Sequence, residues 1–156
     1  MSLFSCPEDC GQIRRELGLI HYYPFNLELG EFDLFNDNSL VVKVKKSVQL
    51  DNLHKDTVER LRRFVDFRKT PHYEGKSMRR KRAFQEFGSP FYDDLYNPHI
   101  TIGEISDPEY LREPVENGLL DSSVFNGLVW QVHAFHLLKR DKSWEKVEVF
   151  PFKARS

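Results

Sequence analysis

The spacing of apolar residues switches repeatedly along this chain between the two-residue period of a strand and the 3.6-residue period of a helix. Val42 and Val44 alternate with lysines, which predicts a strand over residues 39–48. Over residues 50–67 the apolar side chains instead recur at the spacing of one helix face. A chain that carries both periods in turn is expected to fold into a mixture of helices and strands.

The order of these segments predicts the fold class. From the N-terminus it is helix, two strands, helix, strand, helix, two strands, with a polar segment over residues 68–82. The expected helices cover residues 7–18, 50–67 and 106–120, and the expected strands cover residues 22–35, 39–48, 99–105, 128–140 and 144–152. We therefore expect one α+β domain over residues 1–156, with helices packed on a mostly antiparallel sheet. Within it, residues 1–21 form an N-terminal helix and lead-in, and residues 22–156 form the main region.

The third expected helix has recognisable end signals. Asp107 is a residue type that caps helix N-termini, and Pro108 suits the first helical position. Pro114 lacks the backbone N–H that a helix interior uses, so it should bend or shorten the helix.

The stretch YNPHITIG, Tyr96–Gly103, carries the clearest chemical signal. The strand period places His99 and Thr101 on one face, which we expect to be open. It places Ile100 and Ile102 on the other face, which we expect to be buried. An imidazole can act as a general acid or base near neutral pH, and a threonine hydroxyl can donate a hydrogen bond to a phosphate oxygen. The pair suits attack on a phosphodiester; the alternative is an ordinary strand histidine beside a β-forming threonine.

Composition restricts the partners that this chain can bind. A formal net charge of -1 argues against a broad electrostatic grip on nucleic acid, so contact with RNA requires a local basic patch. No apolar run approaches the length of a membrane span, and the first residues lack the pattern of a signal peptide. Cys6 and Cys10 are interpreted as reduced thiols of a cytoplasmic protein. No metal-ligand spacing is present, and we expect no cofactor.

The motif and the segments around it resemble the two-histidine (2H) phosphoesterase superfamily, which includes the 2'-5' RNA ligases and the cyclic nucleotide phosphodiesterases. PHITIG is similar to the HxTx motif of that superfamily. The ordered segments PFNLELGEF, LVVKVKKS, LDNLH and LLKRDKSWEKVEVFPF look like the part of its fold that follows the first catalytic strand. FVDFRKTP and FGSPFY look more specifically like members found with phosphonate-degradation genes.

The resemblance implies two pseudo-symmetric lobes that each carry one HxTx motif, with one histidine acting as base and the other as acid. In this chain His99 opens the only H-x-[ST] sequence. In family terms residues 22–156 then correspond to one lobe with adjoining elements and lack the first HxTx strand. Three alternatives follow: the sequence is a fragment, the gene has lost the first lobe, or a homodimer or a partner chain supplies the second HxTx. With one HxTx alone we expect weak or no activity.

The function that this resemblance implies is a phosphodiesterase-like activity on RNA or nucleotide 2'-5' or 2',3'-cyclic phosphates. His99 and Thr101 would form half of the active site. The alternatives are a non-catalytic relative that binds a phosphorylated ligand or a protein partner, and an interaction domain in which HITI is an ordinary strand.

Basic and aromatic residues that precede the motif are candidates for substrate binding. Arginines could reach a phosphate, and tyrosines could stack on a base. Each candidate also has a structural alternative. The arginines over residues 79–82 could belong to a solvated run of charges, Arg68 could satisfy carbonyl groups at a helix end, and the tyrosines could pack at a strand edge. The candidates are Arg68, Arg79, Arg80, Arg82, Tyr92 and Tyr96.

Overall fold

The computed structural model describes residues 11–35, 39–65, 67, 78–107, 109–125, 130–140 and 144–153. The contacts within the chain divide it into two compact units. The helical unit comprises Met1–Phe25, Val48–Tyr96 and Val132–Ser156, and the sheet unit comprises Asn26–Ser47 and Asn97–Gln131. Strands β1 (Phe25–Leu27) and β5 (Trp130–Val132) pair with each other, and each spans a point where the chain passes from one unit to the other.

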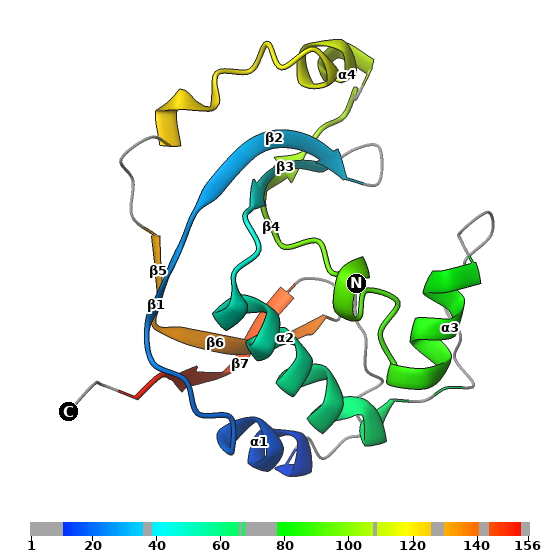
Figure 1. Cartoon of the computed structure of the whole chain (residues 1–156), viewed down its shortest axis with the longest axis vertical. Coiled ribbons are helices and arrows are strands. Elements are labelled where there is room, and N and C mark those ends of the chain that lie inside the picture. Colours follow the sequence, from blue (N-terminus) through cyan, green and yellow to red (C-terminus); the bar gives the residue numbers. More distant parts are fainter. Residues whose placement is uncertain are drawn as a thin grey trace. The chain divides into compact units, whose positions relative to one another are not determined.

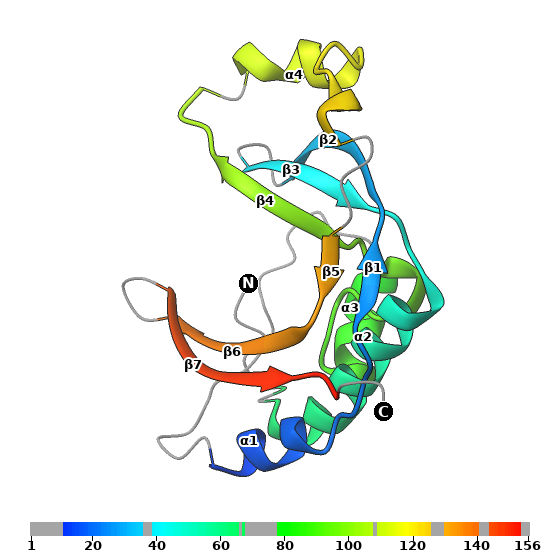
Figure 2. The ribbon, with the colours of Figure 1, turned by 90° about the vertical axis from the view of Figure 1, so that its left-hand side faces the viewer.

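An antiparallel sheet forms the centre of the sheet unit. Its strands lie in the order β2 (Leu29–Phe35), β3 (Ser39–Val44) and β4 (His99–Glu104), and Figure 2 shows β3 between the other two. Val41 and Val42 of β3 are each only 1% exposed, so the central strand is buried on both faces. Burial of each β-branched side chain stabilises the sheet by about 1.5–3 kcal/mol.

One helix and one 3-10 turn contact strand β2 of the same sheet. Helix α4 (Glu109–Glu116) and turn η3 (Ser122–Phe125) both pack near β2, and the rings of Phe32 and Phe125 lie 5.4 Å apart. Pro114 lies inside α4, and the helix ends two residues later. This helix is shorter than residues 106–120, as the proline predicts. Pro108 lies outside the described residues.

In the part of the helical unit that the structure describes, helices α1, α2 and α3 accompany a β-hairpin, and Figure 1 labels each of them. Its elements are α1 (Gly11–Gly18), α2 (Val48–Leu61), η1 (Arg62–Phe64), α3 (Met78–Phe87), η2 (Asp93–Leu95), β6 (Ala134–Arg140) and β7 (Trp144–Pro151). β6 and β7 pair antiparallel. The core of the unit is Ile13, Leu17, Ile20, Leu61 and Phe150. None of the described helices is long and apolar enough to cross a membrane.

The structure confirms the α+β prediction, and it also differs from the sequence-based expectation at several points. No helix was expected over α3, whose first residues fall in the expected polar segment 68–82, because Phe84 is its only buried residue and gives little apolar periodicity. The expected strand over residues 22–35 is divided into β1 and β2, and the expected strand over residues 128–140 is divided into β5 and β6. The described strands form three small sheets, in the orders β1–β5, β2–β3–β4 and β6–β7.

Gly88 ends helix α3 in a conformation that favours glycine. Its N–H donates to the carbonyl of Phe84 at 2.7 Å, and its φ is +75°. A Cβ at this position would lie 2.5 Å from Cγ2 of the buried Val65. Backbone strain and overpacking therefore both oppose a side chain here.

The first prediction concerns this helix end. Gly88→Ala should lower the free energy of unfolding by roughly 2–4 kcal/mol, as measured by urea denaturation. Gly18→Ala is the matched control, because a Cβ at Gly18 would meet nothing within 4 Å. Equal stability of the two variants would show that neither the backbone conformation at Gly88 nor its contact with Val65 opposes a side chain.

Candidate active site

His99 and Thr101 lie on the same face of strand β4, as the strand period predicts. In the antiparallel register, His99 faces Lys43 of β3 and Thr101 faces Val41. Ile100 faces Val42 on the opposite side of the sheet. The Thr101 side chain is exposed and that of His99 is half-buried, so both groups can be reached from solvent.

The prediction that Ile102 is buried is wrong, because its side chain is 56% exposed. The cause is a β-bulge in strand β4. Leu40 pairs with Gly103 and Val41 pairs with Thr101, which leaves Ile102 as an extra residue between them. An extra residue in a bulge interrupts the alternation of side chains between the two faces of a strand. Ile102 is therefore not directed into the buried layer. Ile100, before the bulge, is partly buried.

Two contacts fix the orientation of the His99 ring. Its Nδ1 lies 2.9 Å from the backbone carbonyl oxygen of Asn97, and its ring lies 4.6 Å from the ring of Phe35. A carbonyl oxygen can only accept a hydrogen bond, so Nδ1 must carry the proton. In the neutral ring Nε2 is then the basic nitrogen that can accept a proton.

The structure adds two charged residues to this face that the sequence analysis did not select. Lys43 is the direct cross-strand partner of His99, and its Nζ lies 3.1 Å from Oδ2 of Asp33 on β2. Both side chains are partly exposed. The alternation of Lys43 with Val42 and Val44 shows only that Lys43 faces away from those valines. The pairing that brings it beside His99 involves a strand more than fifty residues along the chain.

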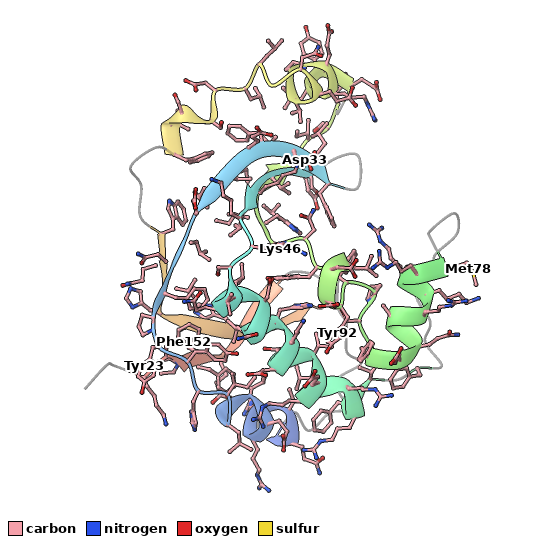
Figure 3. The ribbon with its side chains drawn as sticks, viewed as in Figure 1. Tyr23, Asp33, Lys46, Met78, Tyr92 and Phe152 are labelled. Carbon is pink, nitrogen blue, oxygen red and sulfur yellow. The ribbon has the colours of Figure 1, made fainter. Side chains whose placement is uncertain are left out.

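Tyr92 belongs to the helical unit, where it bridges helices α2 and α3 (Figure 3). Its hydroxyl donates to Oε1 of Glu59 on α2 at 2.7 Å, and its ring stacks on Phe87 of α3 at 3.9 Å. The hydrogen bond to the carboxylate raises the pKa of Tyr92 to about 12. Because Phe87 stacks on Tyr92, one face of the tyrosine ring is already occupied. A role of Tyr92 in stacking on a base stays a prediction.

Tyr96 also lies in the helical unit, at its last residue before the chain enters the sheet unit. Its ring stacks on His54 of α2, with centroids 3.8 Å apart and planes 5° apart. Nε2 of His54 lies 2.9 Å from the carbonyl oxygen of Phe91. Burial is the main cause that raises the pKa of Tyr96 to about 12. These contacts hold Tyr96 against α2 just ahead of the HITI strand.

The candidate arginines that the structure describes lie on helix α3. Arg79 pairs with Asp94 of turn η2, and the guanidinium of Arg80 lies 5.3 Å from the centre of the Phe91 ring. Arg82 is exposed on the same helix. Arg68 lies outside the described residues, as do Cys6 and Cys10. Binding of substrate phosphate by any of the four arginines stays a prediction.

Turn η2 joins these helices to the segment that leads into β4. Asp93 adopts a φ of 57°, which is uncommon for a residue other than glycine, and its carboxylate pairs with Lys55 of α2 at 2.6 Å. Asp94 pairs with Arg79 of α3. The turn is thus held from both helices. Among the side chains that the structure describes, no group of three His, Cys, Asp or Glu residues could hold a metal ion.

The second prediction tests Tyr92 as a structural residue. Its folded-state pKa lies above the value of about 10 for an unfolded tyrosine, so the hydrogen bond stabilises fully below pH 10 and loses this effect as pH rises through about 12. Tyr92→Phe should lower the free energy of unfolding by about 1 kcal/mol or less at pH 8, and by less at pH 11.

Urea denaturation at the two pH values measures this difference. Tyr23→Phe is the control, because Tyr23 is 54% exposed in the same unit. A Tyr92→Phe variant as stable as the wild type at pH 8 would contradict the structural role.

Comparisons with known proteins identify the family. A model of the 2'-5' RNA ligase superfamily matches residues 4–144, which include parts of both units and the HITI strand. Searches of curated proteins and of solved structures found no match. The narrower resemblance to members found with phosphonate-degradation genes stays a prediction. The superfamily suggests a phosphodiesterase-type function, and the match over most of the sequence shows that this chain belongs to the 2'-5' RNA ligase superfamily of 2H phosphoesterases.

Proposed function

We propose that this protein is a phosphodiesterase that acts on RNA or nucleotide 2'-5' or 2',3'-cyclic phosphates, with His99 and Thr101 forming half of its active site. One observation carries the proposal. This chain belongs to a phosphoesterase superfamily, and it presents an oriented imidazole and an exposed hydroxyl on the same face of strand β4. The two groups lie two residues apart on a regular part of β4, before the bulge.

His99 acts as the proton acceptor in this reaction. A water molecule attacks phosphorus, and Nε2 of His99 takes the proton that this water releases. The hydrogen bond from Nδ1 to the Asn97 carbonyl holds the ring in the tautomer that leaves Nε2 free to accept. The contact with Phe35 limits rotation of the ring, so the ring loses less rotational freedom when substrate binds.

Thr101 stabilises the phosphoryl group. Its hydroxyl donates a hydrogen bond to a non-bridging oxygen, where negative charge increases in the transition state. The bond from phosphorus to the leaving ribose oxygen breaks, and that oxygen takes a proton from a general acid. This acid belongs to the other half of the site, which the HITI strand does not supply.

A second copy of the chain and a separate partner chain are the two sources that we propose for this acid. A second copy would bring another His99 to the same phosphate through a two-fold axis. In that case, specific activity should rise with protein concentration. A partner chain would instead have to be added to restore turnover.

A non-catalytic binding protein is the second candidate function. The observation that favours it is that His99 opens the only H-x-[ST] sequence of the chain. Such a protein would bind a phosphorylated ligand at the same face without turnover. Binding with no hydrolysis at any protein concentration would favour this function over the phosphodiesterase.

The third prediction tests the assignment of His99 and Thr101. His99→Ala should reduce hydrolysis of a nucleoside 2',3'-cyclic phosphate by about 10²–10⁴-fold, because general acid–base catalysis is lost. Thr101→Val should reduce it by roughly tenfold to a hundredfold through loss of one hydrogen bond. His133→Ala is the control, since His133 is an exposed histidine of the helical unit.

Nuclear magnetic resonance separates binding from turnover in the same experiment. Titration with the cyclic phosphate should shift the His99 and Thr101 signals and leave the His133 signal in place. Hydrolysis above background that is equal in the wild-type and His99→Ala proteins would refute the assignment, and so would an unchanged His99 signal at millimolar ligand.

A further inference from the structure

The sheet face that carries Thr101 also carries one charged or titratable side chain from each of its three strands. They are Asp33 on β2, Lys43 on β3 and His99 on β4. Lys43 of the central strand faces His99 directly. Asp33 of β2 faces Val41, so it is the diagonal neighbour of Lys43, within reach of a long side chain. Lys43 therefore lies between a carboxylate on one side and the candidate catalytic imidazole on the other. Figure 3 labels Asp33 on β2.

The carboxylate of Asp33 is held in place by two groups. Its Oδ1 accepts the N–H of Leu34 at 2.9 Å, and its Oδ2 lies 3.1 Å from Nζ of Lys43. The Asp33 and Lys43 side chains are 38% and 45% exposed, so a dissolved anion can approach both. The ammonium group has three donors, and it can contact an incoming phosphate while it still contacts Asp33.

The two charges act differently on phosphates of different charge. A phosphodiester carries one negative charge, whereas a phosphomonoester at pH 8 carries about two. Lys43 attracts the dianionic monoester about twice as strongly as the diester at equal distance, and Asp33 repels the monoester about twice as strongly. The fixed carboxylate therefore offsets the preference for the monoester product that the lysine alone would give.

We propose that Lys43 binds a non-bridging oxygen of the phosphodiester and that Asp33 weakens the binding of dianionic phosphomonoesters at this site more than the binding of the diester. This inference rests on the proposed function, because it requires that the scissile phosphate lies beside His99. It assigns to the Lys43–Asp33 ion pair the discrimination between substrate and product, a task that the pair His99 and Thr101 does not perform.

The fourth prediction measures this discrimination by isothermal titration calorimetry at pH 8. The probes are adenosine 2',3'-cyclic phosphate, a diester, and adenosine 2'-monophosphate, a monoester. Lys43→Gln should weaken binding of the cyclic phosphate by about tenfold, and Lys43→Arg should restore most of it. Asp33→Asn should tighten binding of the monophosphate by about three- to tenfold and tighten binding of the cyclic phosphate by less.

A second ion pair of the same unit provides matched controls. Lys45 pairs with Glu28, and it lies beyond the last β3 residue that pairs with β4. Lys45→Gln and Glu28→Gln make the same charge changes, and each should alter both affinities by less than about twofold. If these controls match the Lys43 and Asp33 variants, net charge rather than the position beside His99 governs binding, and the inference is wrong.

Two further outcomes would overturn the inference while the proposed function stands. In one, Lys43→Gln binds the cyclic phosphate as tightly as the wild type. In the other, Asp33→Asn changes the affinities for monoester and diester by the same factor. In both, the His99 signal still moves when the ligand binds to the wild type. A wild-type protein that binds neither nucleotide would refute the inference and the proposed function together.

Discussion

The pairing between strands β3 and β4 is the constraint on which the candidate active site depends. It sets His99 opposite Lys43 and turns Thr101 to the same face. The register is protected by the burial of Val42, since a slip of one residue that moved Lys43 into the place of Val42 would bury a charged ammonium group at a position that is 1% exposed. The burial of this strand therefore helps to keep His99 and Thr101 on their accessible face.

The helical unit uses its aromatic and charged residues mainly for internal contacts. Tyr92 lies between Glu59 and Phe87, and Tyr96 lies against His54. These interactions converge on the segment that ends at Tyr96, which leads directly into the strand of His99. Residue types that suit nucleotide binding can thus serve to hold a connecting segment, and composition alone does not separate the two roles.

The sequence predicted those features that depend on residues close together in the chain. The face shared by His99 and Thr101 follows from the period of two, and the shortening of α4 follows from the restriction that Pro114 places on a helix. The exposure of Ile102 could not be predicted in the same way, because a bulge arises from the fit between two strands. Helix α3 was missed because one buried residue, Phe84, produces no repeat. Asp33 and Lys43 were missed because their relation to His99 exists only once the three strands are in register.

The bulge at Ile102 has a consequence for how this chain meets other chains. Strand β4 lies at one end of the order β2–β3–β4 among the described strands, and a regular edge strand offers its backbone groups to strands of other molecules. A bulge interrupts the even spacing of those groups and increases the local twist, so a foreign strand cannot add along the full length of the edge. The irregularity follows His99 and Thr101 in the sequence, which leaves their part of the strand in regular register with β3. An edge strand can in this way remain open to a small ligand while it resists intermolecular sheet formation.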